Sequence, residues 1–513
     1  MLTDSTVTSV SPDDPSDLAL LENVHPSTWI NPNPVTRYNL VVVGAGTAGL
    51  VTAAVAAGLG AKVALIERHL MGGDCLNAGC VPSKSLIRSA RAWAATSRGS
   101  EFGIHHSTDT NKNFSAVMER MRRIRARLSR IDSAQRFTDL GVDVFIGSAQ
   151  FTSEDTVEVG EKKLSFSRAA ICTGTRPSVP GIPDLQSINF LTNNTIFSLS
   201  EKPARLAIVG AGPIGCEMAQ TFSRLGSHVT LIEEAEQILP REDCDAAAVV
   251  HHHLNLDKVD IQHSATITQI AQQLQNKVIR YNNSLGQQEL LVDEILIATG
   301  RTPNVENLGL DAANVIAEKS GIVVNQNLQT SNPRIYAAGD ICSPFKFTHT
   351  ADAMAQIVIQ NALFPHPFGF GKANVKSLLI PWCTYTDPEI AHVGLYRNEA
   401  ETQGFNVETF TQPFNEVDRA ILEGEEAGFA RVHIKKGTDK ILGATIVGNN
   451  AGNIISEISV AMNAQQGLSL IGKTIHPYPT QAEVLRKLAN QLRRARFSET
   501  QKSLLTRWFS WTR

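Results

Sequence analysis

Short apolar runs alternate with longer stretches of helical periodicity along most of the chain. An apolar run at 38–43 ends in a glycine-rich segment at 44–49, and after an alanine-rich helical stretch a second apolar run occupies 62–67. A strand, a helix and a second strand in this order are expected to form a parallel βαβ unit. The same plan returns across residues 205–233. The pattern therefore predicts an α/β chain that contains two such units.

Both glycine-rich segments have the spacing Gly-x-Gly-x-x-Gly, which is typical of loops that hold dinucleotides. The first glycine permits a tight turn, the second lets the backbone approach a pyrophosphate, and the third allows the helix to pack closely on the strand. An acid stands 23 residues after the first glycine of each unit, where its carboxylate can accept hydrogen bonds from a ribose. Two complete patterns predict two dinucleotides, FAD in one site and a nicotinamide cofactor in the other. The residues are Gly44, Gly46, Gly49 and Glu67 in the first unit, and Gly210, Gly212, Gly215 and Glu233 in the second.

Three more segments follow apolar runs and end in glycine. Thr173-Gly174 and the segment around Gly300 are interpreted as crossings between domains that also contact the cofactors. The run that ends in Gly339 and Asp340 places a carboxylate where it is expected to meet the sugar-alcohol chain of a flavin. From about Lys376 the pattern changes to mixed strands and helices without a nucleotide loop, which predicts a separate domain.

The composition fits a packed multidomain enzyme. Of 513 residues, 42% are apolar and 19% charged, and the formal net charge is −3. Without a global positive field, nucleic acid is not an expected partner. The basic stretch at 120–130 is interpreted as the solvated face of a helix. The histidines at 251–253 are not expected to share a metal ion, because consecutive residues on a helix point about 100° apart. No apolar stretch approaches the roughly 20 residues of a membrane-spanning helix.

The two ends of the chain carry opposite charge. Residues 1–36 hold five acids and five prolines but no Lys or Arg, so they are expected to form a loose acidic extension. Residues 484–513 hold eight Lys or Arg against one acid. Leu504, Trp508 and Trp511 recur there at helical spacing among basic residues. This tail is expected either to lie on an anionic membrane or to pack on a second copy of the chain.

Two of the seven cysteines form a distinctive pair, Cys75 and Cys80. Zinc would need a further Cys or His pair of matching spacing, which the sequence lacks. A thiolate at the start of a helix gains from the helix dipole, and Lys84 lies one turn beyond Cys80. A redox-active pair is therefore the preferred interpretation. The other five cysteines are scattered and indicate a reducing cytoplasm.

The order of these motifs resembles that of the flavoprotein disulfide reductases. The resemblance covers about residues 38 to 496 and rests on the segment 72–84, both glycine loops, and the segments 298–304, 337–340 and 385–391. It implies an α/β chain with two Rossmann-like dinucleotide-binding domains, for FAD and NAD, and a C-terminal α+β dimerisation domain, assembled as a homodimer. The expected limits are 1–36 for the acidic extension, 37–180 and 303–372 for the FAD domain, 181–302 for the NAD(P) domain, 373–497 for the dimerisation domain and 498–513 for the tail.

The resemblance also implies roles for individual residues. Cys80 is expected to lie against the flavin as the charge-transfer thiol, and Cys75 to meet the acceptor as the interchange thiol. Lys84 is expected near flavin N5, in an ion pair with Glu217. Glu233 stands where NADPH-dependent relatives carry basic residues, so NADH is expected rather than NADPH.

The C-terminal motif departs from that of relatives that reduce small disulfides. Those relatives carry a proton-shuttling histidine held by a glutamate five residues later, whereas here Tyr478 stands in its place and Glu483 is the glutamate. A phenol of pKa ~10 is a poorer base near neutrality than an imidazole of pKa ~6.5. We therefore expect slow turnover of lipoamide or glutathione, unless His476, two residues earlier, substitutes.

Tyr478 and the segment 417–420 resemble mercuric reductase instead. That enzyme delivers its metal through vicinal cysteines near the C-terminus, and the tail here contains no thiol, so mercury reduction is expected to be inefficient. Pro213 also stands where some relatives carry an aromatic nicotinamide gate.

The sequence thus predicts a FAD-dependent NAD(P)H oxidoreductase, nearest to mercuric reductase, that passes electrons through Cys75 and Cys80. A soft metal ion such as Hg(II), a quinone and a small disulfide stay open as the small-molecule acceptor. Dihydrolipoyl dehydrogenase is the alternative enzyme, and a membrane-docked redox sensor is the alternative of another class. The expected location is the cytoplasm, with peripheral contact to the inner face of a membrane through the tail.

Overall fold

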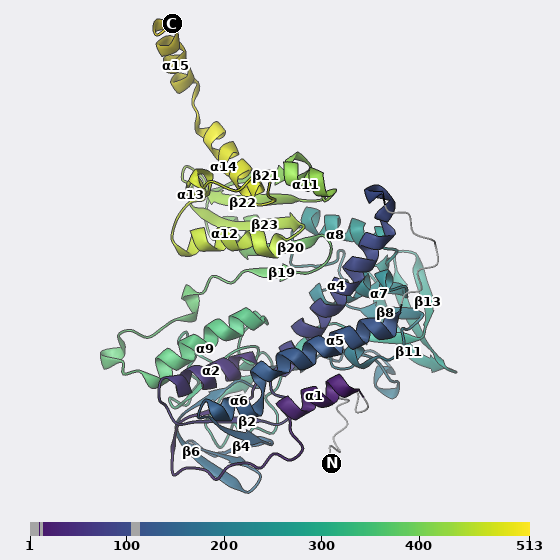
Figure 1. Cartoon of the computed structure of the whole chain (residues 1–513), viewed down its shortest axis with the longest axis vertical. Helices are drawn as coiled ribbons and strands as arrows, with labels where there is room; N and C mark the ends of the chain where they lie inside the picture. The colour runs from purple at the N-terminus through teal and green to yellow at the C-terminus, as the bar shows by residue number, and fades with distance from the viewer. Residues whose placement is uncertain (1–9, 11–13, 104–112) are drawn as a thin grey trace. The chain divides into compact units, whose positions relative to one another are not determined.

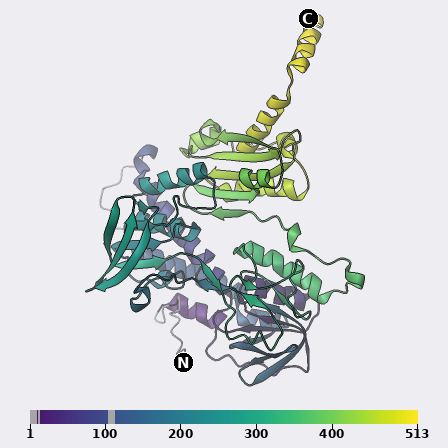
Figure 2. The same cartoon turned by 180° about the vertical axis from the view of Figure 1, so that it is seen from behind.

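The computed structural model describes residue 10 and residues 14–103 and 113–513. Contacts within the chain divide it into two compact units (Figures 1 and 2). The first consists of Met1–Glu234 and Lys258–Leu378, and the second of Ala235–Asp257 and Leu379–Arg513. The segment Ala235–Asp257, which lies inside the predicted NAD(P) range, thus packs with the C-terminal part of the chain.

The first glycine-rich unit belongs to a seven-stranded sheet in the order β3-β2-β1-β6-β5-β4, with β18 also paired to β6. β1 is parallel to both β2 and β6, as the βαβ pattern predicts. All residues of β1 except Asn39 are buried, which explains its nearly continuous apolar sequence. The strands are β1 (Tyr38–Val43), β2 (Val63–Glu67), β3 (Asp143–Ile146), β4 (Ala149–Ser153), β5 (Thr156–Val159), β6 (Lys162–Ile171) and β18 (Ile335–Ala337).

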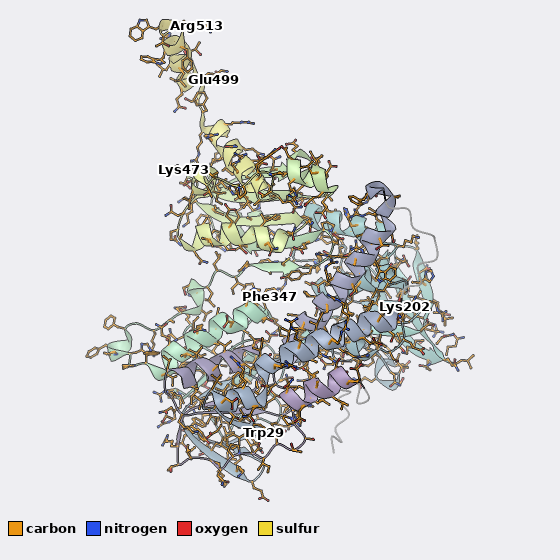
Figure 3. All side chains as sticks on the ribbon, in the orientation of Figure 1. Trp29, Lys202, Phe347, Lys473, Glu499 and Arg513 are labelled. Carbon is orange, nitrogen blue, oxygen red and sulfur yellow. The ribbon has the colours of Figure 1, made fainter. Side chains whose placement is uncertain are left out.

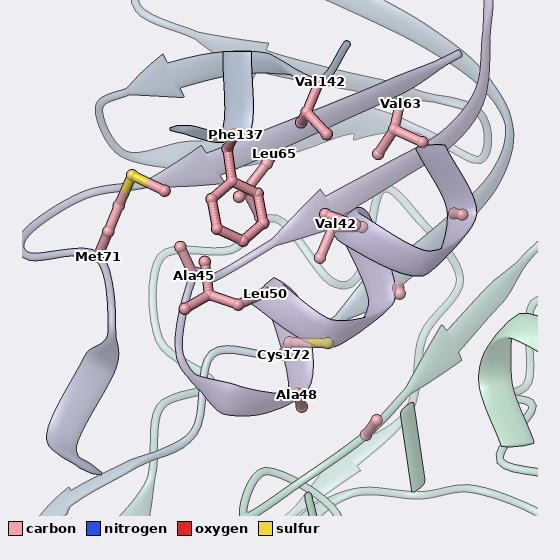
Figure 4. Close-up of a cluster of buried hydrophobic side chains, with 14 of the residues drawn as sticks. Val42, Ala45, Ala48, Leu50, Val63, Leu65, Met71, Phe137, Val142 and Cys172 are labelled. Atoms are coloured by element: carbon pink, nitrogen blue, oxygen red, sulfur yellow. The ribbon is translucent and has the colours of Figure 1, made fainter. Parts of the chain in front are cut away.

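A buried apolar cluster holds this sheet against its helices. Val42, Leu65 and Phe137 come from two strands and a helix and point into the same cluster (Figure 4). Burying one such side chain contributes about 1.5–3 kcal/mol to the free energy of folding. The helices of this unit are α1 (Pro15–Val24), α2 (Thr47–Gly58), α3 (Gly73–Asn77), α4 (Cys80–Ser97), α5 (Phe114–Ser129), α6 (Ala134–Asp139), α7 (Pro213–Arg224) and α9 (Thr348–Leu363).

The second glycine-rich unit builds a four-stranded sheet in the order β10-β9-β8-β14, in which every pair is parallel. The prediction of two βαβ units is therefore confirmed. An antiparallel three-stranded sheet, β11-β12-β13, is inserted before β14. The strands are β8 (Arg205–Val209), β9 (His228–Ile232), β10 (Asp260–Gln262), β11 (Thr266–Gln273), β12 (Asn276–Asn283), β13 (Gly286–Val292) and β14 (Glu294–Ile297).

The two segments interpreted as crossings lie side by side. β7 (Thr175–Pro177) pairs antiparallel with β15 (Arg301–Pro303), although 126 residues separate the paired Thr302 and Arg176 along the chain. A short hairpin, β16 (Ala317–Glu318) and β17 (Gly321–Ile322), follows. The chain thus leaves the first sheet through β7 and returns toward it through β15, and these two strands pair with each other.

The C-terminal unit is built around an antiparallel five-stranded sheet in the order β19-β20-β23-β22-β21. This confirms the predicted C-terminal α+β domain. The strands are β19 (Trp382–Thr384), β20 (Glu389–Gly394), β21 (Val407–Pro413), β22 (Phe429–Lys435) and β23 (Ile441–Gly448). The helices are α8 (Cys244–Leu256), α10 (Arg397–Thr402), α11 (Asp418–Glu423), α12 (Ala451–Asn463), α13 (Leu468–Lys473), α14 (Glu483–Arg496) and α15 (Glu499–Trp511).

The expectation of a loose acidic extension is wrong for the described part of residues 1–36. Helix α1 begins after Asp14, whose side chain caps it, and it buries Leu20 and Val24 in the apolar cluster of the first sheet. Asp17 is fully buried and accepts a hydrogen bond from Arg125 of α5 at 2.6 Å. Its charge is therefore matched inside the protein rather than by water. Residues 1–9 and 11–13 lie outside the described part of the chain.

The same ion pair corrects the interpretation of the basic stretch 120–130. Arg125 and Arg122 of α5 are buried, at 0% and 8% exposure, and only part of the stretch is a solvated face. The reason is that α1 supplies Asp14 and Asp17 as counter-charges for them.

Among the helices of the described residues, none is both long and apolar enough to cross a lipid bilayer.

Candidate redox and dinucleotide site

The first and third glycines of each loop are required by the protein backbone itself. Gly44 and Gly210 have φ angles of +102° and +101°, and a Cβ on either would lie within 2.7 Å of a backbone carbonyl. A Cβ on Gly49 would lie 1.8 Å from Gly44 O, and one on Gly215 would lie 1.9 Å from Gly210 O. Strand and helix can approach this closely only where no side chain intervenes.

The second glycine of each loop is different, because no close protein contact requires it. A Cβ on Gly212 would meet nothing within 4 Å, and one on Gly46 would meet only Gly73 Cα, at 3.8 Å. These residues cap α7 and α2, and neither helix start has a capping hydrogen bond from a side chain. The open space and the helix N-terminus fit the pyrophosphate of a dinucleotide, for which the second glycine leaves room.

The acids predicted from the 23-residue spacing lie directly beside their loops. Glu67 Oε2 accepts a hydrogen bond from Ala45 N at 2.7 Å, and Glu233 Oε2 accepts one from Ala211 N at 2.6 Å. Each carboxylate thus reaches across the carboxyl ends of two parallel strands to the residue after the first glycine. This is the position from which a carboxylate can accept hydrogen bonds from a ribose.

Asp340 lies at the end of β18 in a network that sequence analysis did not identify. Thr175 Oγ1 donates to Asp340 Oδ2 at 3.1 Å, and Arg301 Nε donates to Thr175 Oγ1 at 2.7 Å. Burial raises the pKa of Asp340, while the nearby Arg301 opposes that rise. Arg301 also forms an ion pair with Asp74, the residue before Cys75. The network therefore connects the cysteine loop to the acid predicted to contact the flavin.

The remaining predicted cofactor residues stabilise the crossing between the strands. Thr173 Oγ1 donates to Asn304 O at 2.9 Å, and Asn304 N donates to Gly174 O at 3.0 Å. Gly300 O accepts from Ser178 N at 2.9 Å. These bonds explain the recurring Thr-Gly sequences, and contact with a cofactor remains a prediction for these residues.

Cys75 and Cys80 are brought together by two helices, α3 and α4, that meet at Gly79. Both are free thiols. The neighbouring Cys75 thiol lowers the pKa of Cys80, and Thr348 and Lys84 act in the same direction. The Thr348 Oγ1 atom lies 3.4 Å from Cys80 Sγ. The neighbouring Cys80, together with burial, raises the pKa of Cys75. These surroundings favour the thiolate on Cys80 and the proton on Cys75.

An acid that sequence analysis missed lies next to the cysteine loop. Asp132 follows α5, and its Oδ2 atom lies 3.0 Å from the position of a Cβ on Gly72. Burial raises the pKa of Asp132 to about 6, and its charge raises the pKa of Cys75 further. The only signal in the sequence was an acid at the end of a basic helix, far from the cysteines along the chain.

The ion pair predicted between Lys84 and Glu217 is present. Lys84 Nζ of α4 donates to Glu217 Oε2 of α7 at 2.8 Å. The Glu217 side chain is only 6% exposed, which strengthens its attraction to the ammonium group. The pair connects the helix that carries Cys80 to the helix of the second glycine loop. Its placement beside a flavin stays a prediction.

No hydrogen bond is formed between the predicted C-terminal residues, Tyr478 and Glu483, both of which the structure describes. Tyr478 is exposed and donates to Asp418 Oδ2 at 3.0 Å, a hydrogen bond that raises its pKa, so that still less of it is ionised near neutral pH. Glu483 is buried and accepts from Arg486 at 2.5 Å. His476 lies 3.0 Å from Glu457 rather than near Glu483. Within the described residues of this unit, the histidine and glutamate pair of the resembling enzymes is thus not reproduced.

No group of three or more His, Cys, Asp or Glu side chains in the described part of the chain could hold a metal ion. In the triplet 251–253, His253 Nδ1 lies 2.8 Å from the carbonyl of Val249 in its own helix.

Comparison with known proteins agrees with this geometry. The chain matches the model of the pyridine nucleotide-disulphide oxidoreductases over residues 38–356, and that of the dimerisation domain of these enzymes over residues 380–489. It is 32% identical to mercuric reductase of Staphylococcus aureus over 454 residues, 88% of this chain and 82% of that enzyme. It is 33% identical to dihydrolipoyl dehydrogenase of Chlamydia muridarum over 457 residues, 87% of this chain and 95% of the dehydrogenase.

The fold is also similar to that of a solved structure, the HOCl-induced flavoprotein disulfide reductase RclA from Escherichia coli. The TM-score is 0.79 at 27% sequence identity, and the match covers 88% of this chain and 99% of RclA.

Proposed function

Because the chain belongs to the pyridine nucleotide-disulphide oxidoreductase family, we propose that it passes electrons from NADH through FAD and the Cys75–Cys80 pair to a small-molecule acceptor. It is a flavoprotein disulfide reductase, of a family that uses FAD and NAD(P)H. Residues 380–489 are a dimerisation domain, which supports a homodimer. The observation that carries the proposal is the position of Cys75 in α3 and of Cys80 at the start of α4, with Thr348 Oγ1 3.4 Å from Cys80 Sγ.

The residues present fit two dinucleotides. The first loop and the start of α2 would hold the pyrophosphate of FAD, with Glu67 at a ribose and Asp340 at the sugar-alcohol chain. The second loop and Glu233 would hold NADH. Bound FAD supplies the two-electron chemistry that connects a nicotinamide to a disulfide.

The chain's own groups decide what happens to the sulfurs. Two electrons and one proton open the Cys75–Cys80 disulfide and leave a thiolate and a thiol. The thiolate is favoured on Cys80 and the proton on Cys75, because Thr348 Oγ1 lies 3.4 Å from the Cys80 sulfur and Lys84 lies one helical turn beyond it. Return of both electrons to an acceptor closes the disulfide again and releases the proton. The ammonium group of Lys84 and the hydroxyl of Thr348 stabilise the thiolate meanwhile.

For the acceptor, we propose a soft metal ion such as Hg(II) ahead of a quinone or a small disulfide, with slow metal turnover because the tail contains no thiol. A leaving thiolate needs a proton donor near neutral pH, and Tyr478 is a phenol of raised pKa bound to Asp418. A soft metal ion needs no such proton. The mercuric reductases among the relatives support a metal acceptor, and so does the solved Cu(II) complex of RclA, with a TM-score of 0.78.

A second candidate is dihydrolipoyl dehydrogenase, favoured by the 95% coverage of the chlamydial enzyme. One assay of the FAD-loaded protein distinguishes the two candidate functions. We expect NADH oxidation with Hg(II) to exceed NAD-dependent oxidation of dihydrolipoamide, because the latter lacks a general base that contributes about 100-fold or more. Loss of metal or quinone turnover in Cys75→Ser would show that the pair carries it. Rapid dihydrolipoamide turnover would instead establish the second candidate.

We propose NADH as the electron donor because the carboxylate of Glu233 lies beside the second loop, where it would repel a 2′-phosphate. Glu233→Ala is therefore expected to raise kcat/KM for NADPH relative to NADH by about tenfold. Steady-state kinetics with both donors measures this ratio. If the wild-type protein already prefers NADPH, the assignment is wrong.

We also propose the cytoplasm as the compartment, because the cysteines other than Cys75 and Cys80 are scattered singly along the sequence.

A further inference from the structure

The last helix of the chain, α15, has no packing partner within its own unit. It begins after Ser498, whose hydroxyl accepts from Gln501 N, and the Gln501 side chain accepts from Ser498 N in return. Every residue of the helix is exposed. Its side-chain hydrogen bonds, across the part of the chain that the structure describes, run to residues of the same helix or involve its flanking residues Ser498 and Thr512. Figure 3 labels Glu499, where the helix begins, and Arg513, two residues beyond its end.

One face of α15 is large, apolar and exposed. Leu504, Trp508 and Trp511 are spaced four and three residues apart and therefore share a face. Leu505 and Phe509 widen this face on one side. Their exposed fractions are 60, 42, 54, 57 and 79% for residues 504, 505, 508, 509 and 511. Trp508 and Trp511 contact each other edge to face, with ring centroids 5.5 Å apart. Five large side chains on 13 residues cannot remain in water without cost.

Cations stand at both edges of this apolar face. At 100° per residue, Lys502 projects next to Phe509 at one edge and Arg507 next to Trp511 at the other. The only acid of α15, Glu499, projects from the opposite side. Further positive charge comes from Arg493, Arg494 and Arg496 in the last turn of α14. Leucine and tryptophan flanked by lysine and arginine are the arrangement of helices that lie in the interface of an anionic bilayer.

We propose that α15 docks the enzyme on the surface of an anionic phospholipid bilayer. The apolar face would insert among the acyl chains, and Lys502 and Arg507 would extend to the lipid phosphates. With 13 residues the helix is too short to span a membrane, so it lies in the membrane plane. Residues 490–513 also lie beyond the segment matched to the dimerisation domain, which ends at residue 489. The site is therefore an addition to the enzyme core.

Co-sedimentation of the FAD-loaded protein with lipid vesicles tests this proposal. The wild-type protein is expected to sediment with vesicles of phosphatidylglycerol and phosphatidylcholine, and to bind pure phosphatidylcholine much more weakly. Leu504→Gln/Trp508→Gln removes two residues of the apolar face and is expected to weaken binding about tenfold or more. Ser503→Gln/Ser510→Gln is the matched control, because it places the same two residues on the polar face of the same helix. It is expected to bind like the wild type.

Two further measurements separate the membrane from a second copy of the chain. Lys502→Gln/Arg507→Gln is expected to weaken binding to anionic vesicles and to reduce its dependence on salt. Sedimentation velocity without lipid is expected to give the same dimer for all variants. The proposal is overturned if the wild type ignores anionic vesicles, if the apolar-face variant binds as well as the control, or if that variant dissociates into monomers. The last outcome would assign α15 to the dimer interface.

Discussion

Cys75 and Cys80 are only five positions apart, yet their surroundings give the two sulfurs opposite acidity. The neighbouring Cys75, Thr348 and Lys84 lower the pKa of Cys80. The neighbouring Cys80, burial and the charge of Asp132 raise the pKa of Cys75. The first sulfur is therefore suited to carry negative charge at neutral pH, and the second to hold the proton.

The hydroxyl of Thr348 should set part of this acidity. Thr348→Val keeps the volume but removes the hydrogen bond to the thiolate, so the pKa of Cys80 should rise by about one unit. The pH dependence of alkylation of the reduced protein measures it: the wild type should gain reactivity at a lower pH than the variant. Thr96→Val, which loses a hydroxyl bound only to the backbone of α4, is the control. An unchanged midpoint in Thr348→Val would contradict the assignment.

Asp132 should act on Cys75 only when it is ionised. Above its pKa of about 6, its charge raises the pKa of Cys75; below that pH the neutral acid has little effect. Asp132→Asn should therefore make Cys75 more reactive toward iodoacetamide above pH 6 and leave it unchanged below. Mass spectrometry of the alkylated protein distinguishes the two cysteines. Asp139→Asn, in the following helix α6, should show no such effect; equal behaviour of both variants would exclude the role of Asp132.

Among the elements, helix α1 has the sequence pattern of an exposed acidic segment, yet one of its acids is buried in the protein core. Asp17 is fully buried and paired with Arg125 of α5. Asp17→Ala would leave the guanidinium group uncompensated, and the free energy of unfolding should fall by about 3–5 kcal/mol. Urea denaturation of the FAD-loaded protein measures this loss. Replacing both partners, in Asp17→Leu/Arg125→Met, should restore much of it, and a single variant as stable as the wild type would contradict the buried pair.

The structural elements that could be predicted are those whose sequence pattern lies within one short segment of the chain. The glycine loops, their flanking strands and the acids 23 residues later all lie within one βαβ unit, so spacing alone located them. The burial of Asp17 was not predictable, because its partner lies 108 residues away and both residues are usually solvated. Asp132 and the Arg301 network were not predictable for the same reason, because they reach the cysteine loop only when segments distant in the sequence pack against it. The ion pair of Lys84 and Glu217 was found through resemblance, since nothing local indicates it.

In the molecule as a whole, we expect the segments that match the family to serve a different purpose from the segments outside the match. Residues 38–356 and 380–489 provide the dinucleotide loops, the thiol pair and the dimerisation domain. The chain adds α1 before them, which is packed into the first unit, and α15 after them, which is fully exposed. Helix α1 contributes to the stability of the first unit, and α15 is the helix that we propose to bind a membrane surface.

The central claim is that electrons pass from NADH to the sulfur pair and leave a thiolate on Cys80. Anaerobic titration of the FAD-loaded protein with NADH, followed by absorbance, tests it most directly. The wild type should consume two electrons and develop a long-wavelength band from a thiolate next to oxidised flavin, and the band should weaken as the pH is lowered and the thiolate takes up a proton. Cys80→Ser should retain its flavin and lack the band. Reduction of the flavin by NADH without any band, identical in the wild type and in Cys80→Ser, would contradict the claim.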